Sequence, residues 1–79
     1  MKHKYVVYAF DCDQANRLKG YFMGSGVKHT AIYEGLSLRF EFETTKKQKE
    51  KMCEDFNELL LPDMKLKKQF CHLLVKEVA

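Results

Sequence analysis

The strongest pattern in the chain lies in residues 27–43, VKHTAIYEGLSLRFEFE, where apolar and polar side chains alternate. Alternation with a period of two is typical of a strand that has one buried face. Glu34 and Gly35 suit a two-residue loop between two such strands. A loop at these residues places Lys28 opposite Glu41 on one face and leaves the other face apolar. The sequence therefore predicts an antiparallel β-hairpin.

A strand and a helix are predicted before the hairpin. Residues 4–10, KYVVYAF, are almost continuously apolar and aromatic, which is typical of a central strand buried on both faces. Asp11 or Asp13 can accept hydrogen bonds from the free backbone N–H groups at the start of a helix. Residues 24–26, GSG, end that helix. The first half of the chain is therefore expected to be strand, helix and hairpin.

The second half leaves one element open. Thr45 can cap a second helix, with Gln48 in capping-box spacing, and Pro62 ends that helix. Residues 65–79 fit a strand or a helix, because their apolar residues match both periods. With a strand, the order over about residues 4–78 resembles ferredoxin-like α+β domains: βαββαβ, a four-stranded antiparallel sheet with two helices on one face. With a helix, the chain is a three-stranded sheet with a third, C-terminal helix.

Length and composition fit a single domain over residues 1–79. Fourteen lysines and arginines oppose 11 acidic residues, and the net charge of +3 is mild beside the basic clustering of a dedicated nucleic-acid module. The three cysteines have no C-x-x-C spacing, and no long apolar segment follows the N-terminus. We therefore expect a reduced, cytoplasmic protein with no membrane segment. A domain of this size buries a small core, so a homodimer stays open as its form.

The residues after the first strand argue against catalytic and metal sites. Asp11 and Asp13 flank Cys12, and their charges disfavour both a bound phosphate and a thiolate at that cysteine. A lone cysteine also lacks the second thiolate of a C-x-x-C metal site. We therefore expect no enzyme, no catalytic residue, no cofactor and no metal. The reactivity of Cys12 stays open, and a small-ligand regulatory domain or an enzyme is kept as a second alternative.

The predicted binding surface is the sheet face that the two helices leave uncovered. Aromatic side chains with charges at the edge are typical of protein contacts. The interface candidates are Val6, Tyr8, Phe10, Ile32, Arg39, Phe70 and Leu74. The sequence therefore predicts a small non-enzymatic binding protein, an adaptor, regulator or inhibitor, that contacts a protein partner or forms a homodimer.

Binding of single-stranded nucleic acid or RNA is the alternative function. An RNA-recognition motif has the same order of elements, but its stacking aromatic residues lie on the open face of the sheet. Here Phe40 and Phe42 fall on the face expected to meet the helices. The candidate residues for nucleic-acid contact are Tyr8, Lys28, Arg39, Lys65, Lys67 and Lys68. A steep loss of binding with rising salt would distinguish this function from a protein contact.

Overall fold

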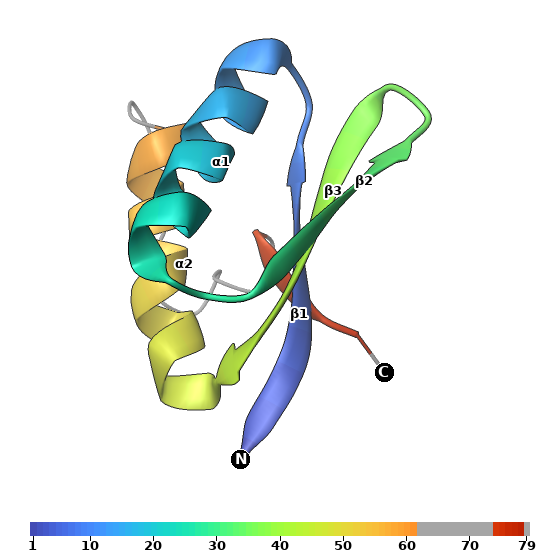
Figure 1. The fold of residues 1–79 in the computed structure, drawn as a ribbon. Helices are drawn as coiled ribbons and strands as arrows, with labels where there is room; N and C mark the ends of the chain where they lie inside the picture. Colours follow the sequence, from blue (N-terminus) through green and yellow to red (C-terminus); the bar gives the residue numbers. More distant parts are fainter. Residues whose placement is uncertain (62–73, 79) are drawn as a thin grey trace.

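The computed structural model describes residues 1–61 and 74–78, which contain four strands and two helices (Figure 1). The elements are β1 (Lys2–Ala9), α1 (Cys12–Ser25), β2 (His29–Glu34), β3 (Ser37–Thr45), α2 (Lys46–Leu60) and β4 (Val75–Glu77). The strands form one antiparallel sheet in the order β2-β3-β1-β4, and both helices cover the same face. This is the predicted ferredoxin-like α+β fold, in which β1 is an inner strand.

The strand alternative for the C-terminal segment is confirmed at β4. Val75 pairs with Val7 and Glu77 pairs with Tyr5, so β4 lies antiparallel beside β1. The sheet therefore has four strands rather than three. The rest of that prediction falls on residues 62–73 and 79, which lie outside the described residues.

Both predicted helix caps are present. The Asp11 side chain, rather than that of Asp13, accepts a hydrogen bond of 2.8 Å from the backbone N–H of Gln14. Thr45 Oγ1 accepts one of 3.2 Å from the backbone N–H of Gln48. Each bond satisfies one of the N–H groups that the first turn of a helix leaves unpaired. The caps therefore fix where α1 and α2 begin, and with them the sides on which the helices leave the sheet.

The hairpin is present, but its loop lies one residue later than predicted. Glu34 pairs with Ser37, and the loop consists of Gly35 and Leu36. Gly35 has a φ of 64°, whereas every described non-glycine residue, Leu36 included, has a negative φ. A type II′ turn has this pattern, because its first central residue takes the positive φ that glycine adopts without strain. The turn geometry therefore places the glycine first in the loop instead of second.

The later loop moves the pairing of β2 with β3 by two residues. Glu41 lies opposite Thr30, so the predicted pair of Lys28 and Glu41 does not form. Arg39 lies opposite Ile32. A shift of two residues keeps every side chain on its predicted face, because the period of a strand is two. The error in the register therefore leaves the predicted faces of the sheet unchanged.

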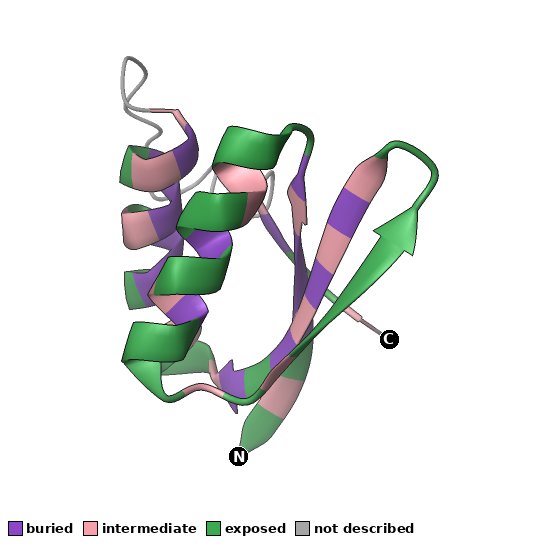
Figure 2. Cartoon of the chain, turned by 45° about the horizontal axis from the view of Figure 1, so that its top comes forward, coloured by how far each residue is buried: buried purple, intermediate pink, exposed green. Residues whose placement is uncertain are grey.

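The core lies between the helices and the inner face of the sheet, the face that the helices cover (Figure 2). Its largest fully buried side chains are Phe22, Phe40, Phe56, Leu18 and Val7. The ring centroid of Phe22 lies 5.5 Å from that of Phe40 and 5.6 Å from that of Phe56. Complete burial of one such side chain contributes about 1.5–3 kcal/mol. Packing of aromatic rings therefore holds the helices onto the sheet.

Two polar contacts join the helices at their margins. The Tyr21 hydroxyl of α1 donates a hydrogen bond of 2.5 Å to Asp55 Oδ2 of α2, and Arg17 Nη1 donates one of 2.8 Å to the carbonyl of Leu59. Burial, followed by the contact with Asp55, raises the pKa of Tyr21 well above its ordinary value. The hydroxyl therefore keeps its proton, and the contact between the helices, well into the alkaline range.

The cysteines differ from the reduced thiols that the sequence predicted. Cys12 is exposed and free, whereas Cys53 is buried among the core residues and is disulfide-bonded. Spacing along the chain could not reveal this bond, because disulfide formation depends on proximity in space. Disulfides persist in oxidising compartments, so the cysteines no longer support a cytoplasmic location. Cys71 lies outside the described residues.

The helices were also compared with the length of a membrane span. Neither α1 nor α2 is long and apolar enough to cross a bilayer, and this finding covers the described residues alone.

Candidate binding face of the sheet

The outer face of the sheet is the one turned away from α1 and α2 (Figure 1). Side chains alternate along a strand, so the residues between the core positions of each strand lie on this face. The register places the following strand residues there: Lys4, Val6, Tyr8, Thr30, Ile32, Glu34, Ser37, Arg39, Glu41, Glu43 and Lys76. The outer face therefore combines apolar, aromatic, basic and acidic side chains.

Arg39 is at the centre of a polar cluster on the outer face. It lies between Tyr8 of β1 and Ile32 of β2 in the register. Arg39 Nη2 lies 2.9 Å from Glu41 Oε1, and Nη1 lies 3.5 Å from Glu34 Oε2. Arg39 Nε is buried and has no hydrogen-bond partner among the described residues. Two carboxylates thus neutralise the guanidinium, and one of its donors is left unpaired.

Aromatic side chains lie beside this cluster. The rings of Tyr8 and Phe10 stack with a centroid distance of 6.2 Å and an interplanar angle of 20°. The Tyr8 hydroxyl donates a hydrogen bond of 3.2 Å to Glu34 Oε2, which links the stack to Arg39. A shallow hollow of about 370 Å³ is lined by both rings together with Glu34, Ser37 and Lys76. Phe10 is 70% exposed, so the stack offers a large aromatic surface to solvent.

The structure brings four of the seven interface candidates together. Tyr8 and Phe10 stack, and Arg39 lies beside Tyr8 and Ile32 in the sheet. Val6 is on the same face but only 6% exposed, between Glu41 of β3 and Lys76 of β4. A partner can therefore reach the aromatic stack and Ile32, but scarcely Val6.

Of the two C-terminal interface candidates, the described one does not extend the face. Leu74 is half-buried and packs against the core, because it precedes β4 instead of lying within a longer strand. Phe70 lies outside the described residues.

The candidates for nucleic-acid contact do not form one basic surface in the described residues. Lys28 is exposed just before β2, and Arg39 is paired with two glutamates. Tyr8 lies beside one of them, Glu34. The remaining candidates lie outside the described residues: Lys65, Lys67 and Lys68. Basic and acidic side chains therefore alternate where a bound strand would need adjacent cations.

Sequence reasoning missed the role of Glu34. The predicted loop included this residue, which left its carboxylate away from the sheet. In the structure Glu34 is the last residue of β2, opposite Ser37, and it contacts both Tyr8 and Arg39. The glycine-first rule for type II′ turns was the signal that would have placed it there.

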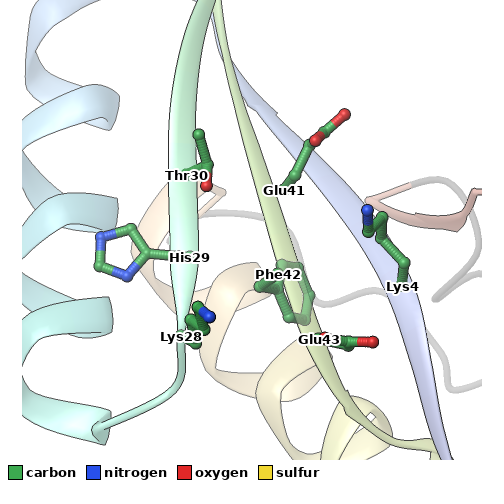
Figure 3. Close-up of a pocket in the computed structure, with 7 residues that line it drawn as sticks. All are labelled: Lys4, Lys28, His29, Thr30, Glu41, Phe42 and Glu43. Atoms are coloured by element: carbon green, nitrogen blue, oxygen red, sulfur yellow. The ribbon is translucent and has the colours of Figure 1, made fainter.

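A second hollow, of about 220 Å³, lies along the start of β2 and the C-terminal half of β3, at the end of the hairpin away from its loop (Figure 3). Lys4, Glu41 and Glu43 project to one side of the sheet, whereas the His29 ring points toward α1. His29 Nδ1 lies 3.2 Å from the carbonyl of Val27, and its ring stacks 4.8 Å from that of Phe22. These contacts hold the imidazole on the helix side, away from the carboxylates of the hollow.

The described residues offer little further chemistry. They hold no group of three or more histidine, cysteine, aspartate or glutamate side chains placed to bind a metal ion. Cys12 is exposed at the start of α1, next to the capping Asp11. No protein-family model, curated protein or solved structure matches the chain. The outer face is therefore the candidate functional site among the described residues.

Proposed function

We propose that the domain is a non-enzymatic binding protein, an adaptor, regulator or inhibitor, whose outer face contacts a protein partner. The observation that carries the proposal is the aromatic stack of Tyr8 and Phe10 beside the neutralised Arg39. Tyrosine and arginine are enriched among the residues that dominate binding energy at protein interfaces. Rigid aromatic rings bury large areas and lose little conformational entropy on binding.

The state of Arg39 adds to this proposal. Its Nε is buried without a hydrogen-bond partner among the described residues, and such a donor costs about 1–3 kcal/mol. Because Glu34 and Glu41 already balance the charge, a neutral group such as a main-chain carbonyl suits the site better than a phosphate.

The test compares retention of proteins from a lysate by the immobilised domain and by two variants. Tyr8→Ala/Phe10→Ala removes the stack, whereas Met23→Ala removes a side chain of similar exposure from α1. We expect a protein that the parent and Met23→Ala retain equally, and that the double variant loses at least about tenfold, which corresponds to 1.4 kcal/mol. Equal retention by all three would contradict the proposal. Thermal melts check that each variant is folded.

Nucleic-acid binding is tested on the same samples. Retention on a mixed oligonucleotide resin that falls steeply with salt would favour the alternative function. The mixture of charges on the outer face leads us to expect no such retention.

A further inference from the structure

The two edges of the sheet differ in how well they are protected. The β4 edge is three residues long and carries Lys76 and Glu77, and short, charged edges resist pairing with other chains. The β2 edge is six residues long and largely exposed. Among the described residues, β2 has no strand neighbour besides β3. The fold therefore leaves one long edge open.

The sequence of β2 lacks the features that usually protect an edge. Its residues, HTAIYE, contain no proline and no lysine, and its pairing with β3 is continuous without a bulge. Tyr33 is 81% exposed although it lies within the strand. A strand of β-branched and aromatic residues with open backbone groups is a template for a second strand.

The turn determines which backbone groups of β2 are open. In a two-residue hairpin loop the residues that flank the loop, here Glu34 and Ser37, exchange hydrogen bonds. Along β2, alternate residues then direct their N–H and C=O groups toward β3 or away from it. The residues that direct them away are His29, Ala31 and Tyr33. The open edge therefore presents three evenly spaced pairs of donors and acceptors.

We propose that β2 pairs antiparallel with β2 of a second copy of the chain, about a two-fold axis at Ala31. In this register Ala31 faces Ala31 of the second copy, and His29 faces Tyr33 of the second copy. Each of these pairs exchanges both of its backbone hydrogen bonds, so all the open groups of β2 are satisfied. The proposal goes beyond the proposed function, because its backbone hydrogen bonds lie at the edge of the sheet and leave the stack of Tyr8 and Phe10 on the outer face free.

Charge complementarity selects this register. It places Lys28 opposite Glu34 of the second copy, and the symmetry repeats the pair at the other end of the interface. An axis at Ile32 instead sets Lys28 opposite Leu36 and brings Glu34 opposite Thr30, which leaves Lys28 without an opposite charge across the interface. Ile32 would then lie at the axis, although its backbone N–H and C=O groups point toward β3. The Ala31 register is therefore the one that pairs both the charges and the backbone.

The symmetry is compatible with the helices. A two-fold axis perpendicular to the sheet keeps both sets of helices on the same side of a continuous eight-stranded sheet. The hairpin extends away from α1 toward its loop, so the upper part of β2 is uncovered (Figure 1). The helix-side face of β2, including Tyr33, gains cover from the neighbouring strand.

The proposal is tested by sedimentation equilibrium of the full chain over a wide range of concentrations. We expect a dimer that Ala31→Pro abolishes, because proline removes an outward N–H group that β3 does not use. Lys28→Glu places a glutamate opposite Glu34 of the other copy at both ends of the interface. It is therefore expected to raise the dimer dissociation constant about tenfold. Lys19→Glu, which makes the same charge change on an exposed position of α1, is expected to leave it unchanged.

A second measurement keeps the test decisive if Ala31→Pro does not fold. Amide hydrogen exchange of the parent chain is expected to slow at His29, Ala31 and Tyr33 as the concentration rises. A parent chain that stays monomeric at all concentrations would overturn the proposal. So would a dimer that folded Ala31→Pro leaves intact, since this outcome places the contact elsewhere. Neither result bears on the aromatic stack, so failure of this proposal is distinguishable from failure of the proposed function.

Discussion

The two faces of the sheet share their strands but hold their side chains in different ways. On the inner face, Phe40 and Phe42 contact other rings and are almost fully buried. On the outer face, the neighbouring Arg39 and Glu41 form an ion pair and keep partial contact with water. Burial of apolar area stabilises folded chains strongly, whereas exposed ion pairs contribute about 0–1 kcal/mol.

This difference separates stability from recognition within one sheet. Substitutions on the inner face should change the free energy of unfolding, and substitutions on the outer face should change binding with little effect on unfolding. The following predictions test that separation, beginning with the largest expected effect.

Phe56→Ala should cause the largest loss of stability. Phe56 is fully buried against Tyr21 and Phe22, and truncation of such a ring costs about 3–5 kcal/mol. A domain of this size has roughly 4–12 kcal/mol in total. Urea unfolding followed by circular dichroism measures the loss. Phe10→Ala on the outer face is the control and should change stability by less than about 0.5 kcal/mol; equal losses would remove the contrast between the faces.

Tyr21→Phe should lower the free energy of unfolding by about 1–2 kcal/mol. The substitution keeps the ring contacts but removes the hydroxyl that donates to Asp55, a charged acceptor. Tyr33→Phe is the matched control, because Tyr33 is exposed in the hairpin. Urea unfolding at neutral pH compares the two. If both variants match the parent, the contact between the helices does not contribute to stability.

The same tyrosine makes stability depend on alkaline pH. The folded state holds the Tyr21 proton more tightly than the unfolded chain, whose tyrosine pKa is near 10. This contribution is therefore complete below about pH 10 and declines as the pH rises further toward the folded pKa. Between about pH 8 and about pH 11, the unfolding midpoint should fall less in Tyr21→Phe than in Tyr33→Phe. Tyr5, whose pKa is also raised by burial, leaves part of the slope in both.

Arg39→Met should have the smallest effect on stability, within about 1 kcal/mol of the parent. Methionine keeps much of the side-chain length and removes a buried Nε that has no hydrogen-bond partner among the described residues. We expect partner retention to fall all the same. A large loss of stability, seen in urea unfolding, would mean that the ion pairs of the outer face belong to the structural core of the domain.

Much of the fold could be predicted from local patterns. Alternation in residues 27–43 assigned each side chain to its face. Asp11 or Asp13 was predicted as one cap and Thr44 or Thr45 as the other, because an oxygen before a helix satisfies free N–H groups, and the structure selects Asp11 and Thr45. These features depend on residues only a few positions apart. A wrong register between two strands therefore does not change them.

The features that were missed depend on which residues are paired across the sheet. The observed pairing of β2 with β3 differs from the predicted pairing by two residues, which leaves every side chain on the same face of the sheet. Alternation alone therefore could not detect the error. Glu34 consequently met Arg39 and Tyr8 unpredicted. The prediction of reduced thiols missed the disulfide at Cys53 as well. Local patterns thus predicted where side chains point, but not which charged or sulfur-containing groups meet.

The hairpin loop also bears on how fast the chain folds. The same apolar face is buried by a loop at Glu34 and Gly35 and by the native loop at Gly35 and Leu36. A newly formed hairpin therefore gains similar early contacts from either loop. A hairpin closed in the first way must reopen before β2 can take its native pairing with β3. We expect such molecules to refold late, and the φ preference of one glycine then controls how many of them there are.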